Sequence, residues 1–272
     1  MLKVLHILDH SLPLHSGYTF RSQNLFRAQR NLGYEPVIVT SPKHEQSWKG
    51  AWDEKEEING FSYYRSGATR SLPGPITSEA WLIYVLARRI YQVALQEKPA
   101  ILHAHSPVLN AIAALWVARK LKLPLVYEIR AFWEDAAVDH GTTHEGSLRY
   151  RITKSIETRV CRRVDHVAIL CDGLKNDLVE RGIPAQKITP VFNGVNPDDF
   201  KPCAVDAEYL QQWGVAGKKI IGFIGSFYRY EGLDLLVRAF ARIAAQQPDT
   251  LLLLVGGGEM EAELKELIAA LG

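Results

Sequence analysis

Cysteine, long apolar runs and net charge are all scarce in this sequence of 272 residues. Its 3 cysteines, Cys161, Cys171 and Cys203, form no CxxC pair and have no histidines at zinc-ligand spacing. Such cysteines suit a reducing compartment and free thiols. The apolar stretches are broken by charge within about a dozen residues, short of the roughly 20 that a membrane span needs. Met1 to Asp9 enters a strand-like pattern without a basic leader, so we expect a cytoplasmic protein.

The charge balance does not point to nucleic acid as a partner. Lysine and arginine total 32 against 30 acidic residues, a net charge of +2, which gives no whole-molecule argument for binding nucleic acid. The hydrophobic share of 47% and the charged share of 23% are those of an ordinary globular protein.

The pattern along the chain predicts an α/β protein with parallel sheets. Short apolar runs alternate with segments of helical period, as in repeated βα units. We predict strands at 3–8, 36–40, 101–105, 125–129, 166–170 and 188–192, and helices near 18–32, 78–97, 108–121, 147–163 and 173–181. Residues 42–76 break this rhythm and are interpreted as a loop insertion around a possible hairpin at 57–65.

The second part of the chain predicts a smaller unit. Residues 1–200 form the expected first domain, 201–217 an interdomain linker, and 218–272 the start of a second domain with strands at 219–224 and 250–255 and helices at 232–245 and 259–271. A parallel sheet needs helices on both of its faces, and a unit of two strands and two helices is too small for that arrangement. We therefore expect the second lobe to be incomplete.

Two strand-to-helix turns could bind phosphate. Gly17 lies between the first strand and the first helix, where ligands bind in parallel sheets and helix amides attract anions. In the second lobe the turn from Gly225 to Gly232 repeats this arrangement, with Arg229 as a possible cation, and Gly256 follows the next strand. A plain glycine-containing turn is the alternative at Gly17, and the Gly225–Gly232 turn alone is a weak signal that Gly256 strengthens.

Polar and aromatic residues end two neighbouring strands of the first domain. His103 and His105 share one face of their strand, where histidine can position hydroxyls or move protons. The run from Tyr127 to Asp135 combines charge with aromatic rings, as sugar recognition requires. Structural hydrogen bonding and an ion-paired surface loop are the respective alternatives, and no third ligand at metal spacing is visible.

The predicted helix 147–163 is strongly basic. It carries Arg149, Arg151, Lys154, Arg159, Arg162 and Arg163, with Glu157 between them. Such a face could contact anionic lipid headgroups or a phosphorylated acceptor, although a solvated helix face is the commoner explanation.

Taken together, these motifs resemble the retaining family 4 glycosyltransferases, which have a GT-B fold of two Rossmann-like lobes. The resemblance rests on the run from Ile188 through Asn193, Gly194 and Asn196 to Pro202, and on the Gly225–Gly232 turn with the following 233–240. The segments 10–20, 127–135 and 227–232 resemble the exosortase-associated branch, which is linked to bacterial exopolysaccharide assembly.

The resemblance implies site roles. Donor-binding residues would be Gly17, Tyr18, Gly225, Ser226, Arg229, Glu231, Gly232 and Gly256; acceptor-binding residues His15, His103, Trp133 and Glu134; and catalytic residues Arg130, His105 and Glu128. Many members have a catalytic-site histidine where this chain has Arg130, so Arg130 is expected to position donor or acceptor. Ser226 and Glu231 stand where the family usually has Arg and Lys, and the family's acidic motif of two glutamates is expected beyond Gly272.

The implied activity is transfer of a sugar from a nucleoside-diphosphate sugar to a glycan or lipid-linked acceptor, with retention and with no cofactor or metal. Two alternatives remain: a non-catalytic fragment that binds nucleotide or acceptor, and a sugar-nucleotide epimerase of the same architecture. We further expect peripheral contact with the inner face of the plasma membrane through helix 147–163, no nucleic-acid partner, and possible homodimers through an exposed sheet edge.

Overall fold

The computed structural model describes residues 1–48, 50–67, 74–139, 141–204 and 206–271. These residues form two compact units, Met1–Gly194 and Val195–Gly272. Each unit is described by itself below. Within the described ranges, no helix is both long enough and apolar enough to cross a bilayer.

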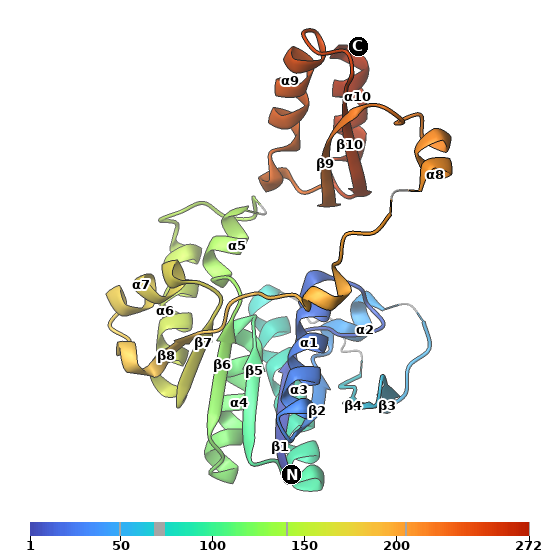
Figure 1. Ribbon diagram of the computed structural model, residues 1–272. Coiled ribbons are helices and arrows are strands. Elements are labelled where there is room, and N and C mark those ends of the chain that lie inside the picture. Colours follow the sequence, from blue (N-terminus) through green and yellow to red (C-terminus); the bar gives the residue numbers. More distant parts are fainter. Residues whose placement is uncertain (49, 68–73, 140, 205, 272) are drawn as a thin grey trace. The chain divides into compact units, whose positions relative to one another are not determined.

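The first unit is built on an eight-stranded sheet in the order β3-β4-β2-β1-β5-β6-β7-β8 (Figure 1). Its strands pair in parallel except for β3, which is antiparallel to β4. The strands are β1 (Leu2–Leu8), β2 (Tyr34–Thr40), β3 (Lys55–Ile58), β4 (Phe61–Tyr64), β5 (Ile101–His105), β6 (Leu125–Ile129), β7 (His166–Ile169) and β8 (Ile188–Pro190).

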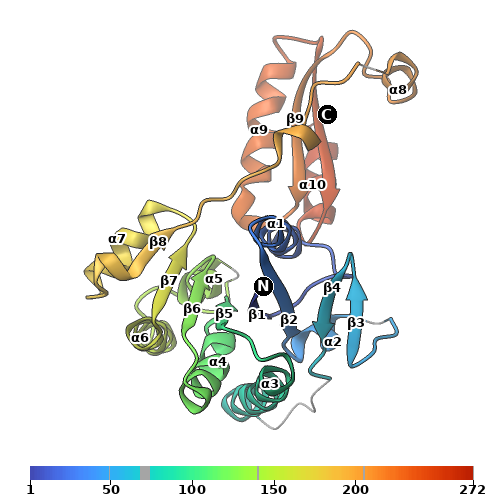
Figure 2. The ribbon, with the colours of Figure 1, turned by 60° about the horizontal axis from the view of Figure 1, so that its bottom comes forward.

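Helices cover the two faces of this sheet. Helices α3 (Pro75–Glu97), α4 (Val108–Leu121) and α6 (Leu148–Arg163) lie along one face, and α1 (Gly17–Asn31) lies on the opposite face (Figure 2). Right-handed crossovers produce this arrangement. The connection from β1 to β2 runs toward one edge of the sheet, and the connections from β4 through β5 and β6 to β7 run toward the other, so their helices lie on opposite faces. The unit is completed by α2 (Lys43–Ser47), α5 (Trp133–Asp139), α7 (Asp172–Glu180) and a short 3₁₀ turn at Ala185–Lys187.

Alternation along β1 separates an apolar face from a partly polar one. Leu5 and Ile7 belong to the main core, which also includes residues of α3 and α4. His6 lies between them in sequence and is also fully buried, on the face covered by α1. Because side chains alternate along a strand, the even-numbered positions of β1 point toward α1, and His6 brings a polar group into that layer.

The segment 42–76 is more than the loop insertion that its composition indicated. It contains α2 and the expected hairpin β3–β4, which adds two strands to the sheet because β4 pairs with β2. Asn59 and Gly60 turn the hairpin with φ of 54° and 75°, the left-handed region that Asn-Gly turns favour. Residues 49 and 68–73 of this segment lie outside the described residues.

The second unit contains a parallel pair of strands with two helices. Its elements are a 3₁₀ turn (Pro197–Asp199), α8 (Ala207–Gln212), β9 (Lys219–Ser226), a 3₁₀ turn (Arg229–Glu231), α9 (Leu233–Ala244), β10 (Thr250–Gly257) and α10 (Glu261–Leu271). Phe227, Leu233, Val237, Met260 and Leu264 form its buried core. Thus the strand and helix alternation expected for both parts of the chain is confirmed, and the α/β fold class with it.

Candidate functional site

The carboxyl ends of β1, β5 and β6 bring most of the expected first-domain residues together. In register, His6 of β1 lies beside His103 of β5, and His105 lies beside Glu128 of β6. These four side chains share the face covered by α1, since neighbouring residues in a parallel ladder point the same way. Arg130, two residues after Glu128, belongs to the same group because its Nε donates to the Glu128 carboxylate.

Glu128 is the centre of an ion-pair network. Its carboxylate accepts hydrogen bonds from Arg21 Nε at 3.1 Å and from Arg130 Nε at 3.0 Å, although it is only 1% exposed. Burial opposes ionisation of Glu128, but His105 and His103 hold the pKa of this carboxyl well below its ordinary value. Arg21 and Arg130 form ion pairs with the same carboxylate. Glu128 is therefore a buried, ionised carboxylate that is paired with two arginines of the protein.

Arg130 is also largely occupied by protein partners. Besides Glu128, it donates to the Tyr18 carbonyl at 2.8 Å, to Ser22 Oγ at 3.0 Å and to His105 Nδ1 at 3.0 Å. Its guanidinium also stacks on the Tyr18 ring, 4.0 Å from the centroid. Four of the five guanidinium hydrogens are thereby used, so the geometry favours a role in holding the first turn of α1.

A chain of hydrogen bonds fixes the tautomers of two buried histidines. Because Arg130 can only donate, His105 Nδ1 accepts, and His105 Nε2–H donates to His6 Nδ1 at 2.9 Å. His6 Nε2–H then donates to Gln29 Oε1 at 2.7 Å. Burial lowers the pKa of His105 to about 3 and that of His6 well below its ordinary value, which keeps both rings neutral as this chain requires.

The same histidines lie close enough together to resemble a set of metal ligands. Their nitrogens and one of His103 lie within 4.8 Å of one another. However, His105 Nε2 must carry a proton because Nδ1 accepts from Arg130, and that guanidinium would also repel a cation. This donor set does not fit a metal ion.

Gly17 begins α1 at the carboxyl edge of the sheet. Ser16 caps the helix: its Oγ accepts from the Thr19 amide at 3.1 Å, and its carbonyl accepts from Phe20. The amides of Gly17 and Tyr18 have no acceptor among the described residues, and a Cβ added to Gly17 would meet no atom within 4 Å. The first turn of α1 thus offers two amides and open space to an anion.

Tyr18 has a structural part in this turn. Its hydroxyl donates to the Ser106 carbonyl at 2.9 Å and accepts from the Asp9 amide at 3.1 Å. Burial raises the pKa of this hydroxyl, so it stays a neutral hydrogen-bonding group. Tyr18 therefore ties the loop after β1 to the loop after β5.

Asp9, His10 and Ser16 of the β1–α1 loop were given no individual role from the sequence. His10 Nε2 lies 2.9 Å from Ser16 Oγ, its Nδ1 lies 3.5 Å from Asp9 Oδ2, and its ring stacks on Tyr18 at 4.6 Å between centroids. His10 keeps 27% of its side chain exposed, so it is accessible at this edge, as is His15 of the same loop. Its position directly after a strand was the available signal.

The hairpin β3–β4 supports the same loop from the side. Arg65, immediately after β4, is 1% exposed and donates to Ser11 Oγ and to the Leu12 carbonyl, both at 2.7 Å. Its charge is balanced by Glu56, 2.6 Å away. The loop after β1 is consequently held by a buried cation that comes from the added edge of the sheet.

The expected acceptor residues are separated by the fold. His15 is exposed on the β1–α1 loop, with its ring 5.5 Å from Phe20. Glu134 is fully buried in α5 and pairs with Arg181 at 2.6 Å, while Trp133 packs against the main core. Glu134 and Trp133 thus fix α5, and His103 remains 12% exposed beside Glu128.

In the second unit, two glycine turns approach each other closely. A Cβ on Gly256 would lie 1.8 Å from the Gly225 carbonyl oxygen, and one on Gly258 would lie 2.9 Å from the Phe227 nitrogen. Both glycines have φ near +150°, at 147° and 153°, which side chains disfavour. Gly232 is the N-cap of α9 and has φ of 67°, so three positions of this edge favour glycine.

The charged residues around this turn are mostly acidic. Arg229 donates through Nη2 to Glu263 at 2.9 Å, and its amide donates to Glu259 at 3.1 Å. The pair is exposed, at 68% and 55%, so it is weak and easily exchanged for another anion. Ser226 ends β9, and Glu231 lies in the 3₁₀ turn before Gly232.

Comparison with known protein families gives two matches. Residues 16–194 match the glycosyl transferase 4-like domain, and residues 206–272 match the glycosyl transferases group 1 domain. Gly17 and the network around Glu128 fall inside the first match, and the Gly225–Gly258 turns fall inside the second.

Curated relatives are distant but extend over nearly the whole chain. The sulfoquinovosyl transferase SQD2 of Arabidopsis thaliana is 25% identical over 259 residues, which cover 94% of this chain and 47% of that protein. A GDP-mannose-dependent alpha-mannosyltransferase of Corynebacterium glutamicum is 23% identical over 98% of this chain and 60% of its own length. This chain therefore spans 47% and 60% of the length of these two relatives.

Solved structures share the fold. Anabaena Alr3699/HepE, in complex with UDP and glucose, superposes with a TM-score of 0.70 at 17% identity, over 100% of this chain and 67% of its own. At that identity the likeness shows the GT-B type of α/β fold, as the sequence predicted.

Proposed function

The chain belongs to the glycosyl transferase 4-like family, and from this membership we propose that it transfers a sugar from a nucleoside-diphosphate sugar to an acceptor hydroxyl, with retention. The observation that carries the proposal is the first turn of α1, where the Gly17 and Tyr18 amides and an open space adjoin the polar loop of His10. The related structure that holds UDP and glucose supports a nucleotide sugar as the donor.

The leaving diphosphate is the charge that develops during transfer, so preorganised amides and helix N-termini are the apparatus that lowers the barrier. We assign this part to Gly17 and Tyr18 in the first unit and to the backbone around Gly225, Ser226, Gly232 and Gly256 in the second. Arg229 would leave Glu263 to pair with a phosphate, which replaces one exposed ion pair by another.

The residues around Glu128 act by positioning. Arg130 holds the Tyr18 carbonyl and Ser22, and Glu128 with His105 holds Arg130. The catalytic roles first assigned to Arg130, His105 and Glu128 become the fixing of the helix terminus that faces the donor. His10 is the accessible side chain that would orient an acceptor hydroxyl, together with His15.

The acceptor proposed is a glycan or a lipid-linked glycan in bacterial exopolysaccharide assembly, on the basis of the branch resemblance in segments 10–20 and 127–135. The protein would then work in the cytoplasm at the inner face of the membrane. Homodimers through an exposed sheet edge are a further proposal, which light scattering at increasing protein concentration tests directly.

Substitution of Gly17 separates this function from folding. A Cβ at Gly17 meets no protein atom, and alanine favours helices, so Gly17→Ala should leave thermal stability unchanged. The methyl group would occupy the space proposed for the diphosphate. We expect titration calorimetry with UDP and GDP to show at least a tenfold weaker affinity than the unchanged chain, whereas Gly222→Ala, also in open space, should match the unchanged chain.

A transfer assay tests the reaction itself. UDP- and GDP-sugars are incubated with extracted lipid-linked glycans, and the anomeric configuration of the product is read by proton NMR. Inverted product would contradict retention, and full affinity in Gly17→Ala would contradict the donor site. An epimerised nucleotide sugar formed without any acceptor would favour the epimerase alternative, and nucleotide binding without turnover would favour the binding fragment.

A further inference from the structure

Helices α4 and α6 form a groove on the face of the sheet opposite α1. It has a volume of about 680 Å³ and is floored by apolar residues, with cations at its rim: Ile112, Leu115, Trp116, Arg119, Lys120, Ile156, Arg159, Val160 and Arg163. A second, shallower hollow of about 390 Å³ continues along α6 and is lined by Arg151, Lys154, Arg159 and Arg162 with Ser155 and Thr158.

The cations of this surface lack acidic partners. Among the residues the structure describes, no carboxylate lies within 4.0 Å of Arg119, Arg151, Arg159 or Arg163. The one acidic residue of α6, Glu157, is fully buried against Tyr127 of the sheet. Lys154 reaches Asp177 only at 4.0 Å. A protein with a net charge of +2 thus places seven cations of two helices around these hollows, and Lys154 is the one among them for which the described residues provide an acidic partner.

Apolar side chains are exposed in the same strip. Trp116 is 51% exposed, Leu148 73% and Ile152 50%. On a helix, Leu148, Ile152, Arg159 and Arg163 fall on one side because their spacing is close to whole turns. Lys120 lies over the Trp116 ring, 4.9 Å from its centroid, and so keeps the ring at the rim of the groove.

We propose that the α4–α6 surface docks on an anionic membrane, with lipid headgroups against the arginines and Trp116, Leu148 and Ile152 at the interface. Interfacial helices combine this composition: a cationic face that meets anionic headgroups and exposed tryptophan or leucine that enters the interface. A solvated basic helix would not need the apolar groove beside it. The proposal goes beyond the sugar transfer and holds whatever the donor is.

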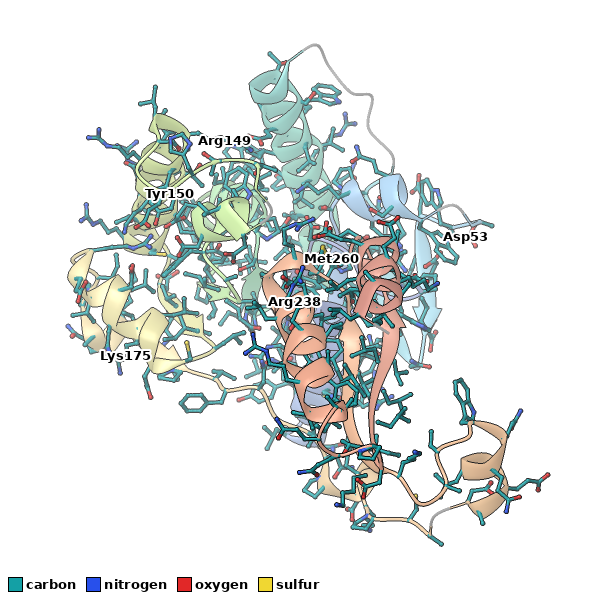
Figure 3. All side chains as sticks on the ribbon, turned by 90° about the horizontal axis from the view of Figure 1, so that it is seen from above. Asp53, Arg149, Tyr150, Lys175, Arg238 and Met260 are labelled. Atoms are coloured by element: carbon teal, nitrogen blue, oxygen red, sulfur yellow. The ribbon has the colours of Figure 1, made fainter. Side chains whose placement is uncertain are left out.

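The direction of α6 relates the docking surface to the site of the proposed sugar transfer, and this relation rests on the proposed function. Helix α6 begins at the carboxyl edge of the sheet, after β6 and α5, and Figure 3 labels Arg149 and Tyr150 in its first turn. Gly17 and His10 belong to the same edge. A membrane along α6 would therefore reach the edge at which a lipid-linked acceptor has to enter.

Vesicle co-sedimentation tests the docking with a matched pair of variants. Arg159→Glu with Arg163→Glu reverses two cations of the groove, and Arg238→Glu with Arg242→Glu makes the same change at the same spacing on the exposed face of α9; Arg238 is labelled in Figure 3. We expect binding to phosphatidylcholine vesicles with one quarter phosphatidylglycerol at 50 mM salt. The α6 pair should weaken it at least about 25-fold, and the α9 pair less than about threefold.

Two further variants and a soluble competitor distinguish the contribution of charge from that of the exposed tryptophan, and a lipid headgroup from a free phosphate. Arg159→Lys with Arg163→Lys should retain binding, since headgroup attraction needs charge and not the guanidinium fork, and Trp116→Ala should weaken binding to the same vesicles. Soluble glycerol phosphate at millimolar concentration should not displace the protein. Circular dichroism melts of every variant confirm folding.

Four results would overturn the proposal: no sedimentation at 50 mM salt, equal binding to pure phosphatidylcholine, equal loss in the α6 and α9 pairs, or full displacement by glycerol phosphate. Capture of a soluble polyanion such as polyphosphate, without vesicle binding, would assign the surface to that class of ligand instead.

Discussion

Arg130 Nη2 donates to His105 Nδ1 at 3.0 Å, and this one bond decides the protonation of both buried histidines. It makes His105 Nε2 a donor and His6 Nδ1 an acceptor, and the chain ends on Gln29. The carboxyl end of β5 is therefore rigidly linked to β1 and α1. Both histidines must stay neutral for this link to form.

Acid should destabilise the first unit through His105 and His6. Their pKa values lie below the ordinary 6.5 in the folded protein, at about 3 for His105, so the unfolded chain binds protons that the folded chain does not. The free energy of unfolding should therefore fall as pH drops below 6.5, by about 1.4 kcal/mol per pH unit for each histidine. Urea denaturation from pH 7 to pH 4.5 measures this slope. His6→Asn should reduce the slope by the contribution of one proton taken up on unfolding.

Glu157 should act in the opposite direction. Burial raises its pKa to about 7, and Tyr127 donates to its Oε1 at 2.5 Å. The folded chain then holds a proton that the unfolded chain loses above pH 4.5, so Glu157 lowers stability as pH rises from 4.5 to 7, by about 3 kcal/mol in total. Glu157→Gln should remove this loss. The difference in unfolding free energy between variant and unchanged chain should grow across that window, and a constant difference would contradict the buried acid.

Loss of the charge at Glu128 should be strongly destabilising. Glu128→Gln leaves Arg21 and Arg130 beside a neutral group at a site that is 1% exposed. Removal of one partner from a buried ion pair costs about 3–5 kcal/mol. Glu54→Gln is the control, because Glu54 is 84% exposed and its ion pair with Arg89 is long, at 3.7 Å. This substitution should change the free energy of unfolding by less than about 0.5 kcal/mol. Equal effects in a urea titration would argue against the network.

Arg21 should control the order of the segment after β8. It donates to the Val191 carbonyl at 2.9 Å, to the Phe192 carbonyl at 3.3 Å and to Asn193 Oδ1 at 2.7 Å. Arg21→Lys cannot make these bonds together because lysine lacks the planar fork. Hydrogen exchange should show faster amide exchange at residues 191–193 in Arg21→Lys, whereas Arg27→Lys, on the exposed side of α1, should leave them unchanged.

Gly256→Ala should unfold the turn of the second unit. The new Cβ would overlap the Gly225 carbonyl at 1.8 Å, and φ of 147° is strained for alanine. We expect a loss of roughly 3 kcal/mol in thermal unfolding, against little change in Gly222→Ala, whose Cβ meets nothing within 4 Å. Similar melting temperatures for the two variants would refute the close approach.

Some features of this protein could be predicted from local pattern alone. The strands at β1, β5 and β6 and the helices between them follow from short apolar runs and helical period, which are properties of neighbouring residues. Gly17 and Gly232 were recognisable for the same reason, since glycine between a strand and a helix marks a turn. The hairpin within residues 42–76 was expected, but the segment was interpreted as a loop insertion because the pairing of the hairpin with β2 cannot be recognised from local pattern.

The amino-acid sequence by itself determined the α/β class, the order of the elements and the glycine turns, because these depend on residues close together in the chain. Only the tertiary structure decided which charged residues stay available. Glu128 is taken up by Arg21, 107 residues away, and Glu134 by Arg181, 47 residues away. Burial fixes such partners by bringing distant side chains into a low-dielectric interior, where a charge without a partner is unstable, and no local pattern records that encounter.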